Sequence, residues 1–139
     1  MENNVVLSRA KLEWSLLGLR LGVFIVLFMW AIDKVLNPNH TAAVLNAFYG
    51  IEGSSATLSY ILGAIQLTVV LSFLVGFQKR WVTLIVLVIH ASSTFISFGK
   101  YLDPWSGVNL LFFAAWPMLA GIAVLYILRE FDTKFSISK

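Results

Sequence analysis

Four long apolar runs limit the folds that are open to this chain. They cover residues 12–36, 57–77, 81–98 and 107–128, and most charged residues lie between them. A bilayer core about 30 Å thick is crossed by about 20 helical residues, so each run is long enough to span a membrane. Only 12% of the 139 residues are charged, against about 25% in soluble domains. The sequence predicts a polytopic membrane protein with a single transmembrane domain over residues 1–139.

The expected fold class is all-α, an integral membrane four-helix bundle. In hydrocarbon every backbone N–H and C=O must be bonded within the protein, and the alternating pattern of a transmembrane barrel is missing from the four runs. Pro38 ends the first helix, because proline lacks an N–H and constrains the residue before it. Residues 40–49 then predict a short interfacial helix in the first outer loop, which Gly50 stops.

The basic residues predict the orientation. Four spans place both termini on one side of the membrane, and the termini and the loop with Lys79 and Arg80 carry most of the lysines and arginines. The two opposite connections carry only Lys34 and Lys100. The positive-inside rule therefore predicts cytoplasmic termini in a bacterial inner membrane. These basic residues flank the spans and form no stripe on a soluble face, so no nucleic-acid partner is expected.

A polar stripe interrupts the third run. His90, Ser93, Thr94 and Ser97 are spaced i, i+3, i+4 and i+7, so they share one face of a helix. The hydroxyls can bond back to carbonyls of their own helix, or they can line a site. His90 can be a buried neutral histidine, or it can contact a ligand or a proton, because histidine titrates near neutrality. The stripe is therefore either structural or the lining of a site.

Arg20 and Gln66 place further polar groups inside the predicted spans. A central arginine costs about 2.5–3.5 kcal/mol on insertion scales. Arg20 is therefore expected to face the bundle, to snorkel to the head groups, or to contact an anion. Gln66 and His90 both fall near the middle of their spans, and Asp33 and Asp103 lie near the outer ends. The sequence predicts a polar intramembrane pocket that opens to the outer face.

The candidate ligand-binding residues of this pocket come from all four runs and their outer ends. They are Arg20, Asp33, Gln66, His90, Ser93, Thr94, Ser97 and Asp103. The chain has no cysteine, which excludes disulfides, thiolate catalysis and c-type haem attachment. The sequence shows no nucleophile–base set, no paired carboxylates and no metal-ligand cluster, so no catalytic residue, metal site or covalent cofactor is expected.

Pairs of small residues at four-residue spacing predict places where helices approach closely. These pairs are Gly18 with Gly22, Ser59 with Gly63, and Ser72 with Gly76. Such pairs are frequent in apolar sequence, and we interpret them as helix contacts.

Two stretches, LRLGVFIVLFMWAIDKVLNP and LGAIQLTVVLSFLVGFQKRW, resemble the DoxX family of small four-helix membrane proteins. The resemblance lies in Arg20, Lys34, Gly63 with Gln66, Gly76 and Arg80. Family members often have an acidic residue where this chain has Gln66. The resemblance implies association with redox systems, including a membrane subunit of quinone-linked thiosulfate oxidation.

Two functions remain open for such a chain. The first is a non-catalytic or quinone-contacting subunit of a redox assembly, with partner membrane or periplasmic redox subunits, membrane lipids around it, and quinone as the candidate ligand. The alternative is a small transporter or a lipid- or small-molecule-binding protein that acts as a homo-oligomer. A self-contained enzyme is less favoured, because the residue sets that carry catalysis are missing from the sequence.

Overall fold

The computed structural model describes residues 3–138, and it contains helices and no strand among these residues. Within this range four helical segments are long and apolar enough to cross a membrane. The predicted all-α membrane fold is therefore confirmed. In chain order the elements are α1 (Arg9–Leu36), α2 (Pro38–Tyr49), α3 (Ala56–Leu74), α4 (Lys79–Ile96), α5 (Phe98–Leu102), η1 (Asn109–Ala114), α6 (Ala115–Ile127) and η2 (Arg129–Phe131).

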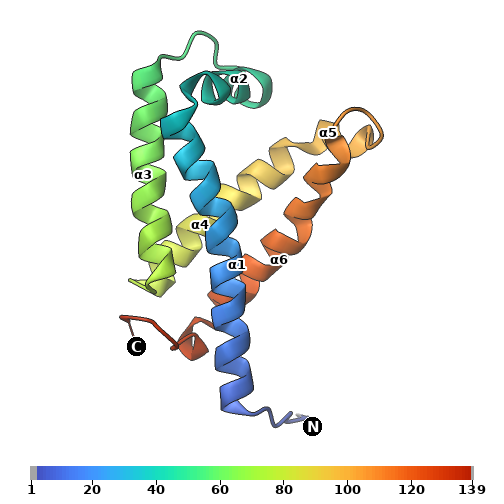
Figure 1. The fold of residues 1–139 in the computed structure, drawn as a ribbon. Helices are drawn as coiled ribbons and strands as arrows, with labels where there is room; N and C mark the ends of the chain where they lie inside the picture. The colour runs from blue at the N-terminus through green and yellow to red at the C-terminus, as the bar shows by residue number, and fades with distance from the viewer. Residues whose placement is uncertain (1–2, 139) are drawn as a thin grey trace.

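The spans form two helix pairs. α1 packs along α3, and α4 packs along α6. Figure 1 shows that the pairs meet near the end of the molecule that holds both chain termini, and that α4 and α6 lean away from α1 and α3 toward the opposite end. We call the first end the tail end and the opposite end, where α2 lies, the α2 end. The arrangement leaves the pairs close at the tail end and apart at the α2 end.

The buried core lies where the two pairs meet. Its members come from α1, α3, α4 and α6, so it ties both pairs together: Leu16, Val23, Leu27, Val70, Phe73, Val86, Ile122 and Leu125. Many other large apolar side chains are exposed on the outside of the helices. Such a surface is suited to lipid, because lipid tails are as apolar as the side chains that face them.

A close contact between α1 and α3 depends on two small residues. The Ser59 hydroxyl donates to the backbone oxygen of Lys34 at 2.5 Å. A Cβ atom added at Gly63 would lie 2.9 Å from Cγ2 of Val35, which is too close for a real contact. The pair Ser59 and Gly63 therefore lets α3 lie directly against α1, as its spacing indicates.

The last span begins as a 3₁₀ helix. Residues Asn109–Ala114 form η1, and the α-helical geometry starts only at Ala115. Pro117 then falls in the first turn of α6. The N–H of Ala115 donates to the oxygen of Phe112 in η1, so the two helices are continuous, whereas proline has no N–H to donate. The backbone thus changes its geometry two residues before the proline.

Arg20 joins α1 to the C-terminal tail, which we define as residues 129–138. Its Nη1 lies 2.8 Å from Oδ1 of Asp132, and its Nη2 donates to the backbone oxygens of Lys134 and Phe135 at 2.5 and 3.2 Å. Arg20 is 1% exposed and Asp132 is 4% exposed. The pair is therefore a buried ion pair with carbonyl acceptors around it.

Two further bonds hold the C-terminal tail against the loop that follows α3 and the start of α4. Nζ of Lys79 donates to the backbone oxygen of Asp132 at 2.7 Å. The backbone N–H of Ile137 donates to the oxygen of Val75 at 2.9 Å. The tail is thus part of the folded structure at the tail end, and Arg20 is one of its main attachments.

Candidate functional site

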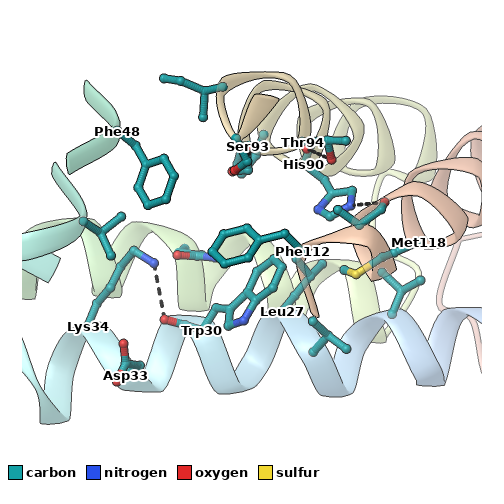
Figure 2. Close-up of a pocket in the computed structure, with 18 of the residues that line it drawn as sticks. Leu27, Trp30, Asp33, Lys34, Phe48, His90, Ser93, Thr94, Phe112 and Met118 are labelled. Atoms are coloured by element: carbon teal, nitrogen blue, oxygen red, sulfur yellow. Dashed lines mark hydrogen bonds between the residues drawn. The ribbon is translucent and has the colours of Figure 1, made fainter. Parts of the chain in front are cut away.

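A cavity of about 1010 Å³ lies between the two helix pairs and extends from the middle of α1 toward α2. We call it the central cavity. α1, α2, α3, α4, η1 and α6 all contribute to its wall. Figure 2 shows large apolar side chains around it, namely Leu27, Trp30, Phe48, Phe112 and Met118. The wall is mainly hydrophobic, as expected of a site for an apolar ligand.

The central cavity opens sideways. Ile65 of α3, Ile85 of α4 and Leu111 of η1 border it and are also exposed at the molecular surface. On membrane-spanning segments such a surface faces lipid. Gly18 and Gly22 of α1 also border the cavity, and, apart from the neighbouring residues and backbone of α1 itself, no atom lies within 4 Å of the position that a Cβ would take at either residue. This small-residue pair therefore leaves open space in the cavity.

His90 lies in the wall of the central cavity and is 1% exposed. Its ring is stacked on that of Trp30, with centroids 6.0 Å apart and an interplanar angle of 21°. Nε2 lies 2.9 Å from the backbone oxygen of Ala115, at the start of α6. Nδ1 is buried and has no hydrogen-bond partner among residues 3–138. His90 thus connects α4 to α6 through one nitrogen and leaves the other unused.

The hydroxyls of the polar stripe bond mainly to their own helix. Oγ1 of Thr94 donates to the backbone oxygen of His90 at 2.7 Å, and Oγ of Ser97 donates to that of Ser93 at 2.8 Å. Tyr101 of α5 also borders the cavity, and its phenol donates to the oxygen of Thr94 at 2.8 Å. Burial raises the pKa of the Tyr101 phenol, so this group stays neutral at ordinary pH.

The carboxylate of Asp33 attaches α2 to the end of α1. It accepts from Nδ2 of Asn37 at 2.9 Å and lies 2.5 Å from Nδ1 of His40. The side chain of His40 is 62% exposed and that of Asp33 is 32% exposed. Asp33 therefore acts at the edge of the central cavity as a link to α2.

Lys34 and Thr41 bring two more polar groups to the α2 end of the central cavity. Figure 2 shows the Lys34 side chain extending into the space that Phe48 faces, and its Nζ donates to the backbone oxygen of Trp30 at 3.3 Å. Thr41 is 5% exposed, and its Oγ1 has no partner in the described part of the chain. The cavity therefore has a cationic donor and an unpaired hydroxyl at this end.

The structure brings most of the candidate residues together and places two of them elsewhere. Those that border the central cavity are Asp33, Gln66, His90, Ser93, Thr94 and Ser97. Arg20 is occupied by the C-terminal tail. Asp103 is exposed after α5, where its backbone oxygen accepts from Nδ2 of Asn109 at 2.9 Å. Neither of these two residues borders the central cavity.

Trp30, Lys34 and Thr41 were not among the candidate residues predicted from the sequence, although they border the central cavity. The spacing of two of them could have been used, because Trp30 and Lys34 are four residues apart and therefore lie on the same face of α1. Thr41 could not be placed in this way, since its position depends on how α2 folds back toward α1.

The polar groups of the central cavity can bind and orient a ligand. They offer a lysine donor, a threonine hydroxyl, an amide from Gln66 and an unpaired histidine nitrogen, all within a wall that is mostly apolar. In residues 3–138 no group of three or more His, Cys, Asp or Glu side chains is placed to hold a metal ion. The arrangement fits an amphiphile with a small polar head and an apolar body.

Comparison with known proteins gives one family. The model of the family described as methylamine utilisation protein MauE matches residues 12–103, which is more than half of the 139-residue chain. The matched range runs from the first turn of α1 to the end of α5, whereas η1 and α6 lie outside it. No curated protein and no solved structure matches the chain.

The match supports the expectation of a small membrane-protein family but does not support the DoxX family specifically. The long apolar spans agree with a membrane-protein family, and the match covers more than half of the chain. The chain belongs to the MauE family of membrane proteins.

Proposed function

We propose that this chain is an accessory membrane subunit of a redox assembly, and that its central cavity binds a quinone or a closely related amphiphile. Family membership supports the accessory role, because MauE is a membrane accessory protein of the methylamine utilisation redox system. One observation carries the binding role: His90 borders an apolar cavity whose flanking residues include exposed ones on the spans, and its buried Nδ1 has no hydrogen-bond partner among residues 3–138. Redox chemistry then belongs to the bound cofactor or to a partner subunit.

The residues of the central cavity fit a quinone. Trp30 and Phe112 offer aromatic faces for a flat ring, and such rings pack well against each other. Lys34 provides a hydrogen-bond donor for one oxygen of the ring, and His90 provides a further polar nitrogen beside the cavity. An isoprenoid tail can leave through the sideways opening beside Ile65. When bound, a quinone would supply two-electron chemistry, and this chain would hold and orient its head.

The proposed setting is the bacterial inner membrane with cytoplasmic termini. The tail end carries Lys79, Arg80 and Arg129, whereas Lys34 and Lys100 lie toward the α2 end. This asymmetry supports a cytoplasmic tail end by the positive-inside rule. Partner redox subunits would then contact the chain within the membrane or at the periplasmic α2 end.

Filling the central cavity tests the binding role. Gly22→Phe places a large side chain in open space of the cavity. Gly99→Phe is the matched control, because Gly99 of α5 is equally unobstructed but does not border the cavity. Each protein is purified in a mild detergent, and its bound lipids are extracted and identified by mass spectrometry. We expect quinone in the native protein and in Gly99→Phe, and at least a tenfold lower content in Gly22→Phe.

The same preparations test the accessory role. Redox subunits that co-purify with the native protein support it. A homo-oligomer that holds only phospholipid, with no quinone and no redox partner, would favour the alternative function of a lipid-binding protein or small transporter. Equal quinone content in the Gly22→Phe and Gly99→Phe proteins would contradict binding in the central cavity.

A further inference from the structure

We infer that the head group held in the central cavity carries a hydroxyl that donates its hydrogen to Nδ1 of His90, so that the site binds a hydroquinone in preference to the oxidised quinone. This inference rests on the proposed function, because it names the form of the ligand that the same cavity takes. It depends on which nitrogen of His90 carries the proton and on what surrounds the other nitrogen.

The partner of Nε2 fixes the proton of His90. Nε2 lies 2.9 Å from the backbone oxygen of Ala115, and a carbonyl oxygen only accepts hydrogen bonds. Nε2 must therefore carry a hydrogen. In a neutral imidazole the other nitrogen then has a lone pair and no hydrogen. Any group that pairs with Nδ1 must consequently be a donor.

No side chain or backbone group in the described part of the chain supplies that donor. The hydroxyl of Thr94, one turn further along α4, donates to the backbone oxygen of His90 and not to its ring. The stack on Trp30 and the bond to Ala115 hold the ring in place. A buried acceptor without a partner is costly, and proteins pair nearly all such groups. The bound molecule is therefore the source of the missing donor.

At the opposite end of the site the protein offers a hydrogen-bond donor, so the ligand needs an acceptor there. Nζ of Lys34 is a donor whose hydrogen bond in the structure goes to its own helix, at the backbone oxygen of Trp30. Because the ring of Trp30 also stacks on His90, the donor and the acceptor flank the same residue. A hydroquinone can donate one hydroxyl to His90 and accept at its other oxygen. A quinone has two acceptor oxygens and leaves Nδ1 unpaired.

Binding of three matched probes tests this inference. The full-length protein is reconstituted in phosphatidylcholine nanodiscs and titrated with a decyl-substituted hydroquinone under nitrogen, with its dimethyl ether, and with the corresponding quinone. The dimethyl ether keeps the ring and the tail but has no hydroxyl hydrogen. We expect the hydroquinone to bind about tenfold more tightly than either other probe, which corresponds to about 1.4 kcal/mol.

Two substitutions at His90 separate its nitrogens. His90→Asn keeps an amide oxygen near the position of Nδ1, whereas His90→Gln carries its amide to the region of Nε2. We expect His90→Asn to retain the preference for hydroquinone and His90→Gln to lose it. Ser92→Ala is the control on the same helix, because Ser92 is exposed, and its hydroxyl donates to the backbone oxygen of Val88. This variant should keep the tenfold preference.

The outcomes distinguish the inference from the proposed function. Equal affinity of the native protein for all three probes would overturn the inference and leave amphiphile binding intact. Failure of the native protein to bind any probe would remove both. A tenfold preference that survives in both His90 variants would show that another group selects the hydroxyl, and would also overturn the inference. If His90→Gln does not fold, the probe series on the native protein and His90→Asn still decides.

Discussion

Replacing Arg20 by methionine should strongly destabilise the protein and release its C-terminal tail. Methionine keeps much of the apolar stem of the arginine but removes its charge and its bonds to Asp132, Lys134 and Phe135. The carboxylate of Asp132, which is 4% exposed, then stays buried without the guanidinium. Removing one partner of a buried ion pair costs about 3–5 kcal/mol.

The groups around Asp132 decide where in this range the cost of Arg20→Met falls. Lys79 remains beside Asp132, since its Nζ lies 2.7 Å from the backbone oxygen of that residue. Its charge partly compensates the carboxylate, so we expect Arg20→Met to lower the free energy of unfolding by about 3 kcal/mol. Asp132→Asn should cost less, about 1.5 kcal/mol, because Arg20 keeps its carbonyl acceptors and loses only a charged hydrogen bond.

Denaturant unfolding in detergent measures these differences, and limited trypsin digestion reports on the tail. The bond that follows Lys134 should be cleaved faster in Arg20→Met than in the native protein. The double variant Arg20→Met/Asp132→Leu removes both charges and should cost clearly less than the sum of the single changes Arg20→Met and Asp132→Leu. Additive costs, or a tail that resists trypsin equally in Arg20→Met and native protein, would refute the ion-pair argument.

Two further substitutions test other contacts. Gly63→Val forces a side chain against Val35, and it should lower the free energy of unfolding by about 1–3 kcal/mol. Gly99→Val is the control, because its side chain has open space, and it should lower the free energy of unfolding by less than about 1 kcal/mol. Similar denaturation curves for the two variants would contradict the close contact. Asp33→Asn removes the carboxylate that contacts Nδ1 of the exposed His40, and it should lower the free energy of unfolding by under about 1 kcal/mol. The amides of α2 should nevertheless exchange hydrogen faster. Unchanged exchange would mean that this contact does not hold α2.

The spans and the polar stripe could be predicted because they depend on local sequence. A run of apolar residues must form a helix in a membrane, since its backbone groups have no other partners. The shared face of His90, Ser93 and Thr94 follows from helical spacing alone. The structure places all three in the wall of the central cavity.

The partner of Arg20 could not be predicted from local pattern. Asp132 lies 112 residues away in the C-terminal tail, and the sequence indicated only that the arginine needed compensation. The sequence pattern also could not decide which of the adjacent residues Asp33 and Lys34 extends its side chain into the cavity. The former binds groups at the start of α2, and the latter extends into the central cavity.

The separation of the two helix pairs at the α2 end also could not be predicted from the sequence. Hydropathy gives the number of spans but not their angles, because lipid is as apolar as the side chains and does not drive helices together. Close contacts such as that of Gly63 with Val35 decide which helices pair. Their positions become known only when the helices are placed together.

The sideways opening of the central cavity decides what can make binding selective there. A ligand that enters from the bilayer leaves an environment as oily as the walls it meets, and it displaces fatty acyl chains that would otherwise fill the space. The dispersion energy of the ligand in the cavity is therefore nearly equal to that of the ligand in the bilayer. Discrimination among membrane-dissolved molecules must then come from shape and from a handful of nitrogen and oxygen atoms, those of His90, Lys34 and Thr41 foremost.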